Sequence, residues 1–158
     1  MNIEMKPIGR VSNSIAPGQK DVRWQDIVST VTISPQWAEG LDGITEFSHI
    51  IVIFYLDHAR DDRPLSLKTH PMGQKNLPEV GIFCTRTPFR PNGIAISTVE
   101  LLSCQGNELT VKGLDAYDAT FVLDIKPYLP RDDKIREARV ADWTLELWQM
   151  LDKQDERV

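Results

Sequence analysis

The stretch GIAISTVELLSC (Gly93–Cys104) is followed by Gly106-Asn107 and then by ELTVKGL (Glu108–Leu114). Apolar residues alternate at the start of the first run, which is typical of a half-buried β-strand. A glycine–asparagine pair between two runs of strand length indicates a β-hairpin. The segment therefore predicts antiparallel strands, and we find no alternating βαβ units around it.

Other segments of strand character lie on both sides of this hairpin. SHIIVIFYL (Ser48–Leu56) is a continuous apolar run of strand length, so we expect it to be buried on both faces. Pro35 is expected to begin a helical turn that ends at Gly40 or Gly43. The polar segment 57–79 is expected to be a loop with one short strand. The remaining expected strands are Ile3–Val11, Asp26–Ser34, Gly81–Thr87 and Thr120–Tyr128.

The C-terminal segment Ala141–Gln154 has the pattern of an amphipathic helix with Asp142 as its N-cap. About seven short strands and one clear helix predict a mainly β protein, either a β-barrel or a β-sandwich. We expect a single domain in which 1–130 form the β-structure. Residues 131–158 would then form a linker and the helix, packed on the same domain.

The helix is apolar over more than one face, which bears on the oligomeric state. Its first apolar stripe is expected at Leu145, Trp148 and Leu151, and a second set is Trp143, Leu147 and Met150. Because a barrel covers only one stripe, the second set predicts a homodimer with its ligand site at or near the interface. The alternative is a helix that closes one end of the barrel without a partner.

Composition limits the class of protein. The 158 residues carry a net charge of −5, which argues against a general nucleic-acid binder. Two cysteines, Cys84 and Cys104, cannot form a disulfide framework and indicate a reducing compartment. The longest apolar run, IIVIF, is five residues, and the first residues lack the features of a signal peptide. We therefore expect a cytoplasmic protein with no membrane partner.

The segment before Gly93 predicts a rigid cationic loop. Arg86 and Arg90 alternate with Pro88 and Pro91, and the loop ends at Asn92. Proline restricts the backbone, and a guanidinium group binds carboxylate or phosphate with two parallel hydrogen bonds. The loop is thus suited to hold an anion. The alternative is that both arginines are solvated, or pair with aspartates and join two loops.

A second charged segment is DAYDATFVLDIKPYLP (Asp115–Pro130). Asp124 and Lys126 lie two residues apart and so on one face of a strand, where they can bind one ligand together or form a solvated ion pair. His49, His58 and His70 match no zinc-binding spacing, so we expect no metal. No glycine-rich nucleotide-binding motif occurs.

Four stretches together resemble one family: PIGRV, GLDGITEFSHIIVI, GIFCTRTPFRPNGIAIS and LDAYDATFVLDIKPYLP. They are similar to the TsaA-like, TrmO-type methyltransferases, which carry R-x-x-x-R-P-N followed by D-x-x-D-G-T-P-x-x-D-I-K-P-Y. The resemblance covers roughly residues 5 to 130. It implies an S-adenosylmethionine-binding β-barrel that lacks the Rossmann fold and is usually a homodimer. The family's activity is N6-methylation of N6-threonylcarbamoyladenosine at position 37 of tRNA, so the implied partner is the tRNA anticodon loop.

The resemblance also implies site residues. A carboxylate would accept the N6 proton and a lysine would stabilise charge on the carbonyl, and the implied catalytic residues are Asp118, Asp124 and Lys126. The implied substrate-binding residues are Arg86 and Tyr128. The implied cofactor-binding residues are Asn13, Ser14, Ser48, His49, Arg86, Arg90, Pro91, Asn92, Thr120, Phe121, Val122 and Leu123.

The chain departs from the family pattern at two points. Ala119 and Phe121 stand where the pattern has glycine and proline, and about 28 residues follow position 130 where longer members have a C-terminal domain. These departures leave two alternatives open. One is a methyltransferase acting on a small molecule or a protein, and the other is a non-catalytic S-adenosylmethionine-binding protein.

Overall fold

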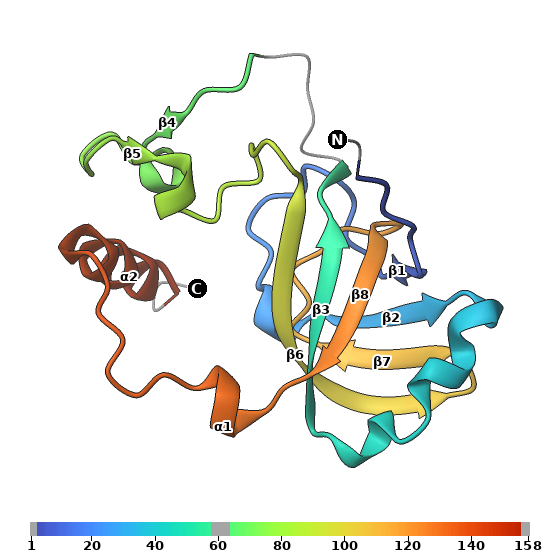
Figure 1. Ribbon diagram of the computed structural model, residues 1–158. Helices are drawn as coiled ribbons and strands as arrows, with labels where there is room; N and C mark the ends of the chain where they lie inside the picture. Colours follow the sequence, from blue (N-terminus) through green and yellow to red (C-terminus); the bar gives the residue numbers. More distant parts are fainter. Residues whose placement is uncertain (1–2, 58–63, 156–158) are drawn as a thin grey trace.

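The structure is a computed structural model that describes residues 3–57 and 64–155. Within these ranges, six antiparallel strands close into a barrel in the order β1-β2-β7-β6-β3-β8 (Figure 1). The barrel strands are β1 (Gly9–Ser12), β2 (Val28–Ile33), β3 (His49–Tyr55), β6 (Ile94–Gln105), β7 (Glu108–Lys112) and β8 (Phe121–Pro127). This confirms a mainly β protein with a C-terminal helix and decides for the barrel over the sandwich.

The hairpin that the sequence predicted joins β6 to β7. Gln105 pairs with Glu108, and Gly106 in the turn has φ of 60°, which costs glycine little. β6 also pairs with β3 along the whole length of β3, from His49↔Glu100 to Tyr55↔Ile94. The barrel closes where the short strand β1 pairs with β8.

An arm, residues 64–84, leaves the barrel between β3 and β6. It contains the two-stranded sheet of β4 (Lys68–Thr69) and β5 (Val80–Gly81), with the 3-10 helices η5 (Pro71–Gly73) and η6 (Ile82–Cys84). The expected short strand in 57–79 is thereby confirmed as β4. The expected strand at Gly81–Thr87 is wrong beyond Gly81, because Thr85 bonds back to the Ile82 carbonyl oxygen through both its amide and its hydroxyl group.

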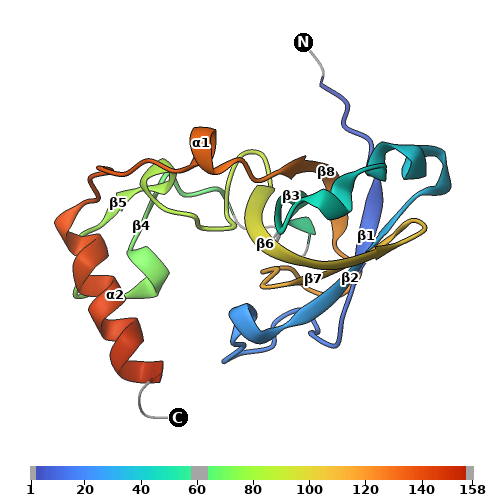
Figure 2. The same ribbon diagram turned by 90° about the horizontal axis from the view of Figure 1, so that it is seen from below.

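The C-terminal part contains α1 (Pro130–Asp133) and α2 (Asp142–Asp155). α2 lies beside β4 and β5 and away from the barrel in both views (Figures 1 and 2). It therefore does not close an end of the barrel. Asn76 of the arm contacts it, with 3.9 Å between Asn76 Nδ2 and Met150 Sδ. None of the helices in the described ranges has the length and apolar character needed to cross a membrane.

The buried face of α2 differs from the expected stripe. Leu147 is buried, and Trp143 and Met150 are half-buried. Leu145 and Trp148, which we expected on the buried stripe, are 48% and 50% exposed. The reason is the position of the helix: it covers the small arm, which buries only one narrow face, and leaves the other apolar face in solvent.

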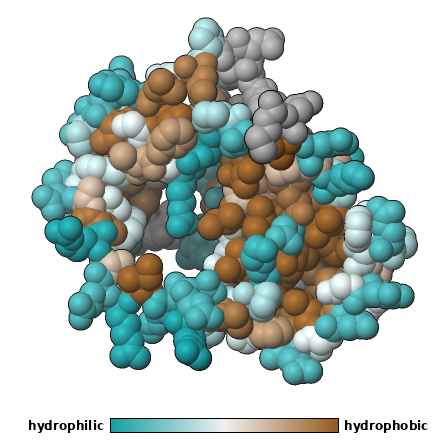
Figure 3. All heavy atoms as spheres, in the orientation of Figure 1, coloured by the Kyte–Doolittle hydropathy of each residue, from teal (hydrophilic) through white to brown (hydrophobic). Residues whose placement is uncertain are grey.

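The outer surface of the barrel is also apolar over β3 and β6. Ile94 and Ile96 of β6 are exposed, and Ile51 and Ile53 of β3 are half-buried. Figure 3 shows apolar side chains gathered on the barrel half of this view, and a hollow between the barrel and the arm. The expectation that β3 is buried on both faces is wrong, because a closed barrel of these strands has one inner face only.

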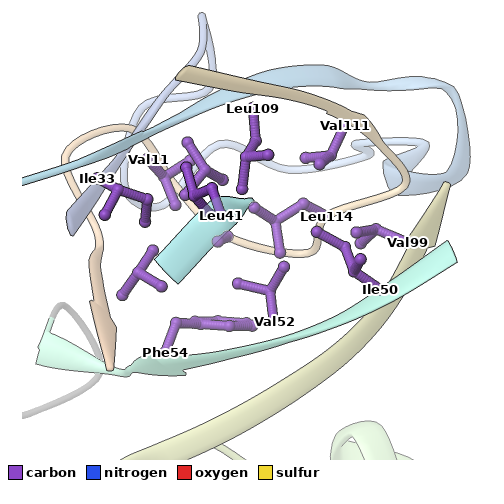
Figure 4. Packing of buried hydrophobic residues seen from close by; sticks show 13 residues of the cluster. Val11, Ile33, Leu41, Ile50, Val52, Phe54, Val99, Leu109, Val111 and Leu114 are labelled. Carbon is purple, nitrogen blue, oxygen red and sulfur yellow. The ribbon is translucent and has the colours of Figure 1, made fainter. Parts of the chain in front are cut away.

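The inner face is packed with side chains. Ile50, Val52 and Phe54 of β3 point inward, towards residues from β1, β2, β6 and β7 (Figure 4). Leu41 from the 3-10 helix η2 (Pro35–Leu41), the helical turn expected at Pro35, joins the same cluster. Each such side chain contributes about 1.5–3 kcal/mol by burial. Because the interior is filled, a ligand of this barrel binds outside it.

Candidate functional site

A pocket of about 1210 Å³ lies outside the barrel, between the end of β3, the first half of β6 and three loops. The loops are the arginine loop, residues 85–92, the segment 113–120 between β7 and β8, and the segment between β1 and β2, which contributes Gly18 and Trp24. The arm contributes Met72. The polar and aromatic lining residues on which the argument depends are Trp24, Arg86, Arg90, Asp115, Tyr117 and Thr120.

Arg90 stabilises the arginine loop. Its Nη1 donates hydrogen bonds to the carbonyl oxygens of Thr85 (2.9 Å) and Thr87 (3.3 Å), and its guanidinium carbon lies 5.9 Å from the ring centroid of Phe83. The amide group of Thr87 in turn donates to Thr85 Oγ1. These contacts hold the loop in one conformation, in agreement with the rigid loop that Pro88 and Pro91 predicted.

Arg86, by contrast, is exposed and has no hydrogen bond or ion pair within the part of the chain that the structure describes. Neither arginine pairs there with an aspartate, so the predicted alternative of two loops joined by ion pairs is not seen. Arg86 is thus a cation of the pocket that is available to a ligand.

Asn13 fastens the β7–β8 loop to the N-terminal segment. Its backbone N–H donates to Asp118 Oδ1 (3.0 Å), and its Nδ2 donates to Ser29 Oγ (2.9 Å) and to the Ala116 carbonyl oxygen (3.0 Å). Its Oδ1 accepts a hydrogen bond from the Ile15 amide (2.9 Å). Because Ser29 is buried, this network replaces its contact with water. Asn13 and Asp118 therefore position the pocket loop, and neither lines the pocket itself.

The two departures from the family pattern lie next to this network. Ala119 has φ of 63°, the left-handed conformation in which a glycine is favoured, and its amide donates to the Val11 carbonyl oxygen (2.9 Å). Phe121 begins β8 opposite Arg10, whose guanidinium carbon lies 4.1 Å from the phenyl centroid. Ala119 thus keeps the backbone conformation that the family's glycine would adopt. The ring of Phe121, which replaces the family's proline, packs against Arg10 outside the pocket.

Asp115 is the acid of the β7–β8 loop that faces the pocket. Its side chain keeps contact with solvent, yet desolvation by the pocket wall raises the pKa of its carboxyl group above the ordinary value. No described residue forms a hydrogen bond or ion pair with this carboxyl group. The same wall carries Trp24 and Tyr117, whose rings meet edge to face with centroids 5.6 Å apart.

A second group of predicted residues lies along β3 and β8, from Ser48, His49 and Tyr128 at the start of β3 to Lys126 and Asp124, which pair with Ile51 and Ile53. Ser48 Oγ and His49 Nδ1 are 2.9 Å apart, and the rings of His49 and Tyr128 meet edge to face at 6.4 Å. Lys126 Nζ lies 2.7 Å from Asp124 Oδ2, and both side chains are about half exposed. The pocket contacts β3 at Phe54 and Tyr55, so Asp124, which pairs with Ile53, lies closer to it along the sheet than Ser48 and His49 do. We name Ser48, His49, Asp124, Lys126 and Tyr128 the outer cluster.

Three predicted ligand residues line the pocket, and the others do not. The three are Arg86, Arg90 and Thr120. Val122 is fully buried in the core and does not line the pocket, and its role as a cofactor residue stays a prediction. The predicted residues that lie near the pocket loops without lining the pocket are Asn13, Ser14, Pro91, Asn92, Asp118, Phe121 and Leu123.

Trp24 and Tyr117 were not found from the sequence. Trp24 begins the short 3-10 helix η1 (Trp24–Asp26) and Tyr117 lies in the β7–β8 loop, and only the fold brings their rings together. Of the histidines, His70 bonds to the Leu77 carbonyl oxygen, and His58 lies outside the described residues. Within the described ranges, no group of three or more His, Cys, Asp or Glu side chains is arranged to hold a metal ion.

Comparison with known proteins identifies the family. Residues 12–134 match the family described as tRNA-methyltransferase O N-terminal domain. The chain belongs to the TrmO family. A protein of Archaeoglobus fulgidus named S-adenosyl-L-methionine-binding protein is 39% identical over 138 residues, which cover 84% of this chain and 94% of that protein. A solved structure of TrmO from Pseudomonas aeruginosa has a TM-score of 0.67 at 28% identity and covers 90% of this chain. The chain spans 62% of that TrmO, so it corresponds to part of the longer protein.

Proposed function

We propose that this TrmO-family protein is a methyltransferase that binds S-adenosylmethionine in the pocket between the arginine loop and the β7–β8 loop. The observation that carries the proposal is the presence, in one cavity, of the Arg86 guanidinium group and the Asp115 carboxyl group, neither of which pairs with a residue that the structure describes. S-adenosylmethionine has both a carboxylate and cationic centres, so the two side chains match its charges.

The pocket also fits the ligand in size and in apolar character. Its 1210 Å³ exceeds the roughly 300–1,000 Å³ of ordinary small-molecule sites, which leaves room for part of a methyl acceptor. Trp24 and Tyr117 offer ring faces and edges for the adenine base. A relative named as an S-adenosyl-L-methionine-binding protein supports the same ligand.

Within this proposal, the main contribution of the chain is alignment. S-adenosylmethionine supplies an electrophilic methyl group. Arg86 holds a carboxylate, Arg90 fixes the arginine loop, and the Asn13 network fixes the β7–β8 loop, so that two reactants meet in a defined orientation. Removal of a proton from an acceptor N–H needs a base. The resemblance to the family implies that Asp124 is this base and that Lys126 stabilises charge on the carbonyl group. Both roles require that the outer cluster contact the methyl acceptor in a pocket.

We propose that the protein is a homodimer in which the outer cluster of one copy lies beside the pocket of the other. An apolar surface supports a dimer: the exposed side of α2 at Leu145 and Trp148. Light scattering at micromolar concentration should give twice 18.0 kDa for the intact protein. A mass of 18.0 kDa for the intact protein would refute the dimer.

For the methyl acceptor, we propose N6-threonylcarbamoyladenosine at position 37 of tRNA, because the arginine motif and the D-I-K-P-Y motif are intact. The alternatives are a small-molecule or protein acceptor, or ligand binding without catalysis. They are favoured by Ala119 and Phe121, by the net charge of −5, and by the shorter chain. Mass spectrometry of nucleosides from tRNA of a strain without this gene decides between them. Loss of the N6-methyl group supports the tRNA reaction, and unchanged methylation at position 37 refutes it.

Calorimetry tests the pocket itself. The wild-type protein should bind S-adenosylmethionine, and Arg86→Ala should weaken binding about tenfold or more, because a charge-assisted hydrogen bond contributes about 1.5–3 kcal/mol. Arg131→Ala, an exposed arginine of α1 outside the pocket, is the matched control and should bind as the wild type does. Equal affinities of both variants would place the cofactor elsewhere.

A further inference from the structure

Asp115 stands apart from the other charged groups of the pocket. The charged or titratable residues that line the pocket are Tyr55, Asp57, Arg86, Arg90, Asp115 and Tyr117. Asp57 already has an interaction with another residue, whereas the carboxyl group of Asp115 has none within the described part of the chain. The pocket therefore offers one carboxyl group without a partner, and both of its arginines lie on a different loop.

Because the arginines and Asp115 lie on different loops, they orient a ligand that carries both a negative and a positive charge. The arginine loop attracts the carboxylate end of the ligand and repels a cationic centre, and Asp115 attracts that centre. In S-adenosylmethionine the charge that changes in the reaction is the sulfonium: the product, S-adenosylhomocysteine, carries a neutral thioether there. The amino and carboxylate groups are the same in both ligands.

We propose that Asp115 is the specificity-determining residue that distinguishes the sulfonium of S-adenosylmethionine from the thioether of S-adenosylhomocysteine. The inference rests on the proposed binding of S-adenosylmethionine in this pocket. A carboxylate near the sulfonium strengthens binding of the methyl donor and contributes little to the binding of the product. Loss of the positive charge then leaves the carboxylate without a partner again, which favours release of the product.

The protonation of Asp115 makes the preference depend on pH. Desolvation raises the pKa of this carboxyl group, so it stays protonated to a higher pH than an ordinary aspartate does. A cationic ligand favours the ionised form. The affinity for S-adenosylmethionine should therefore rise with pH until Asp115 is fully ionised in the free protein, whereas the affinity for S-adenosylhomocysteine should not follow it. Changes in the other pocket groups act on both ligands, so the ratio of the two affinities isolates the sulfonium.

Binding calorimetry with both ligands tests the inference without any turnover. The titrations are done between about pH 4 and 7, the range above the ordinary aspartate pKa of about 3.9. Asp115→Asn should lose about tenfold in affinity for S-adenosylmethionine, the equivalent of one pKa unit, with less than about a twofold change for S-adenosylhomocysteine. For this variant, the ratio of the two affinities should be independent of pH. Sinefungin, which carries an amine in place of the sulfonium, should behave as S-adenosylmethionine does.

Asp42→Asn removes an exposed carboxyl group outside the pocket and should leave both affinities unchanged. Asp115→Glu should restore part of the preference, since it keeps the charge. If Asp115→Asn weakens both ligands equally, Asp115 contacts a group that they share, such as a ribose hydroxyl, and the inference is wrong. It is also wrong if neither affinity changes. If the wild type binds neither ligand, the proposed function fails first, and the inference with it.

Discussion

Ala119→Gly should make the protein more stable. Ala119 has φ of 63°, and its side chain is exposed, so its methyl group contributes little to packing. An L-residue in the left-handed region costs about 1–2 kcal/mol that glycine does not incur. Glycine also gains conformational freedom in the unfolded chain, which costs about 0.4–1 kcal/mol. The difference is a net stabilisation of about 0.5–1 kcal/mol.

Thermal and urea unfolding measure this difference. For a chain of this length, a gain of 1 kcal/mol raises Tm by roughly 2–4 °C. Ala16→Gly is the matched control: Ala16 is an exposed loop residue without positive φ, so the same substitution should lower stability there by up to about 1 kcal/mol. If Ala119→Gly destabilises the protein as much as Ala16→Gly does, Ala119 does not have a left-handed backbone in the native protein. The explanation that Ala119 keeps the conformation of the family's glycine would then be wrong.

Two further substitutions test the walls of the pocket. Asn13→Ala removes three side-chain hydrogen bonds and leaves buried Ser29 without its partner, so the free energy of unfolding should fall by about 2–3 kcal/mol in urea titrations, whereas Ser14→Ala, an exposed neighbour, should change it little. Asp115→Asn should raise the Tm of the ligand-free protein at neutral pH: a carboxyl pKa raised by folding means that the ionised form opposes folding above that pKa. The gain should disappear as the pH falls below the ordinary aspartate pKa of about 3.9, and a gain independent of pH would contradict this cause.

The barrel was predictable from the sequence because its strands carry local signals. The Gly106-Asn107 pair is a local signal for a β-hairpin, and the structure confirms the turn. The expected strand at Gly81–Thr87 failed beyond Gly81, because a hydroxyl–carbonyl contact between Thr85 and Ile82 overrides the β-propensity of the segment. The helix α2 was found, but its buried face was not, since the face depends on what the helix lies against.

The site was harder to predict than the fold. Arg86, Arg90 and Thr120 were identified as ligand residues by the family motif, and they do line the pocket. The motif also includes Asp118, whose carboxylate accepts a hydrogen bond from the Asn13 amide and positions a loop. A motif shows that a residue matters and does not show whether it contacts the ligand. The outer cluster illustrates the same limit, because none of its residues lines the pocket, although Asp124 pairs with Ile53, the neighbour of pocket-lining Phe54.

The segment between β3 and β6, which includes the arm and the arginine loop, begins and ends at neighbouring positions of the barrel. Tyr55 at the end of β3 pairs with Ile94 at the start of β6, and the Leu56 amide bonds to the Gly93 carbonyl oxygen at 2.7 Å. In topological terms, the whole intervening chain, including the arginine loop, is the turn of a β-hairpin. The barrel can keep its register whatever the length of that turn. Natural variation in the insertion can therefore change what the protein recognises while the barrel continues to fold unchanged.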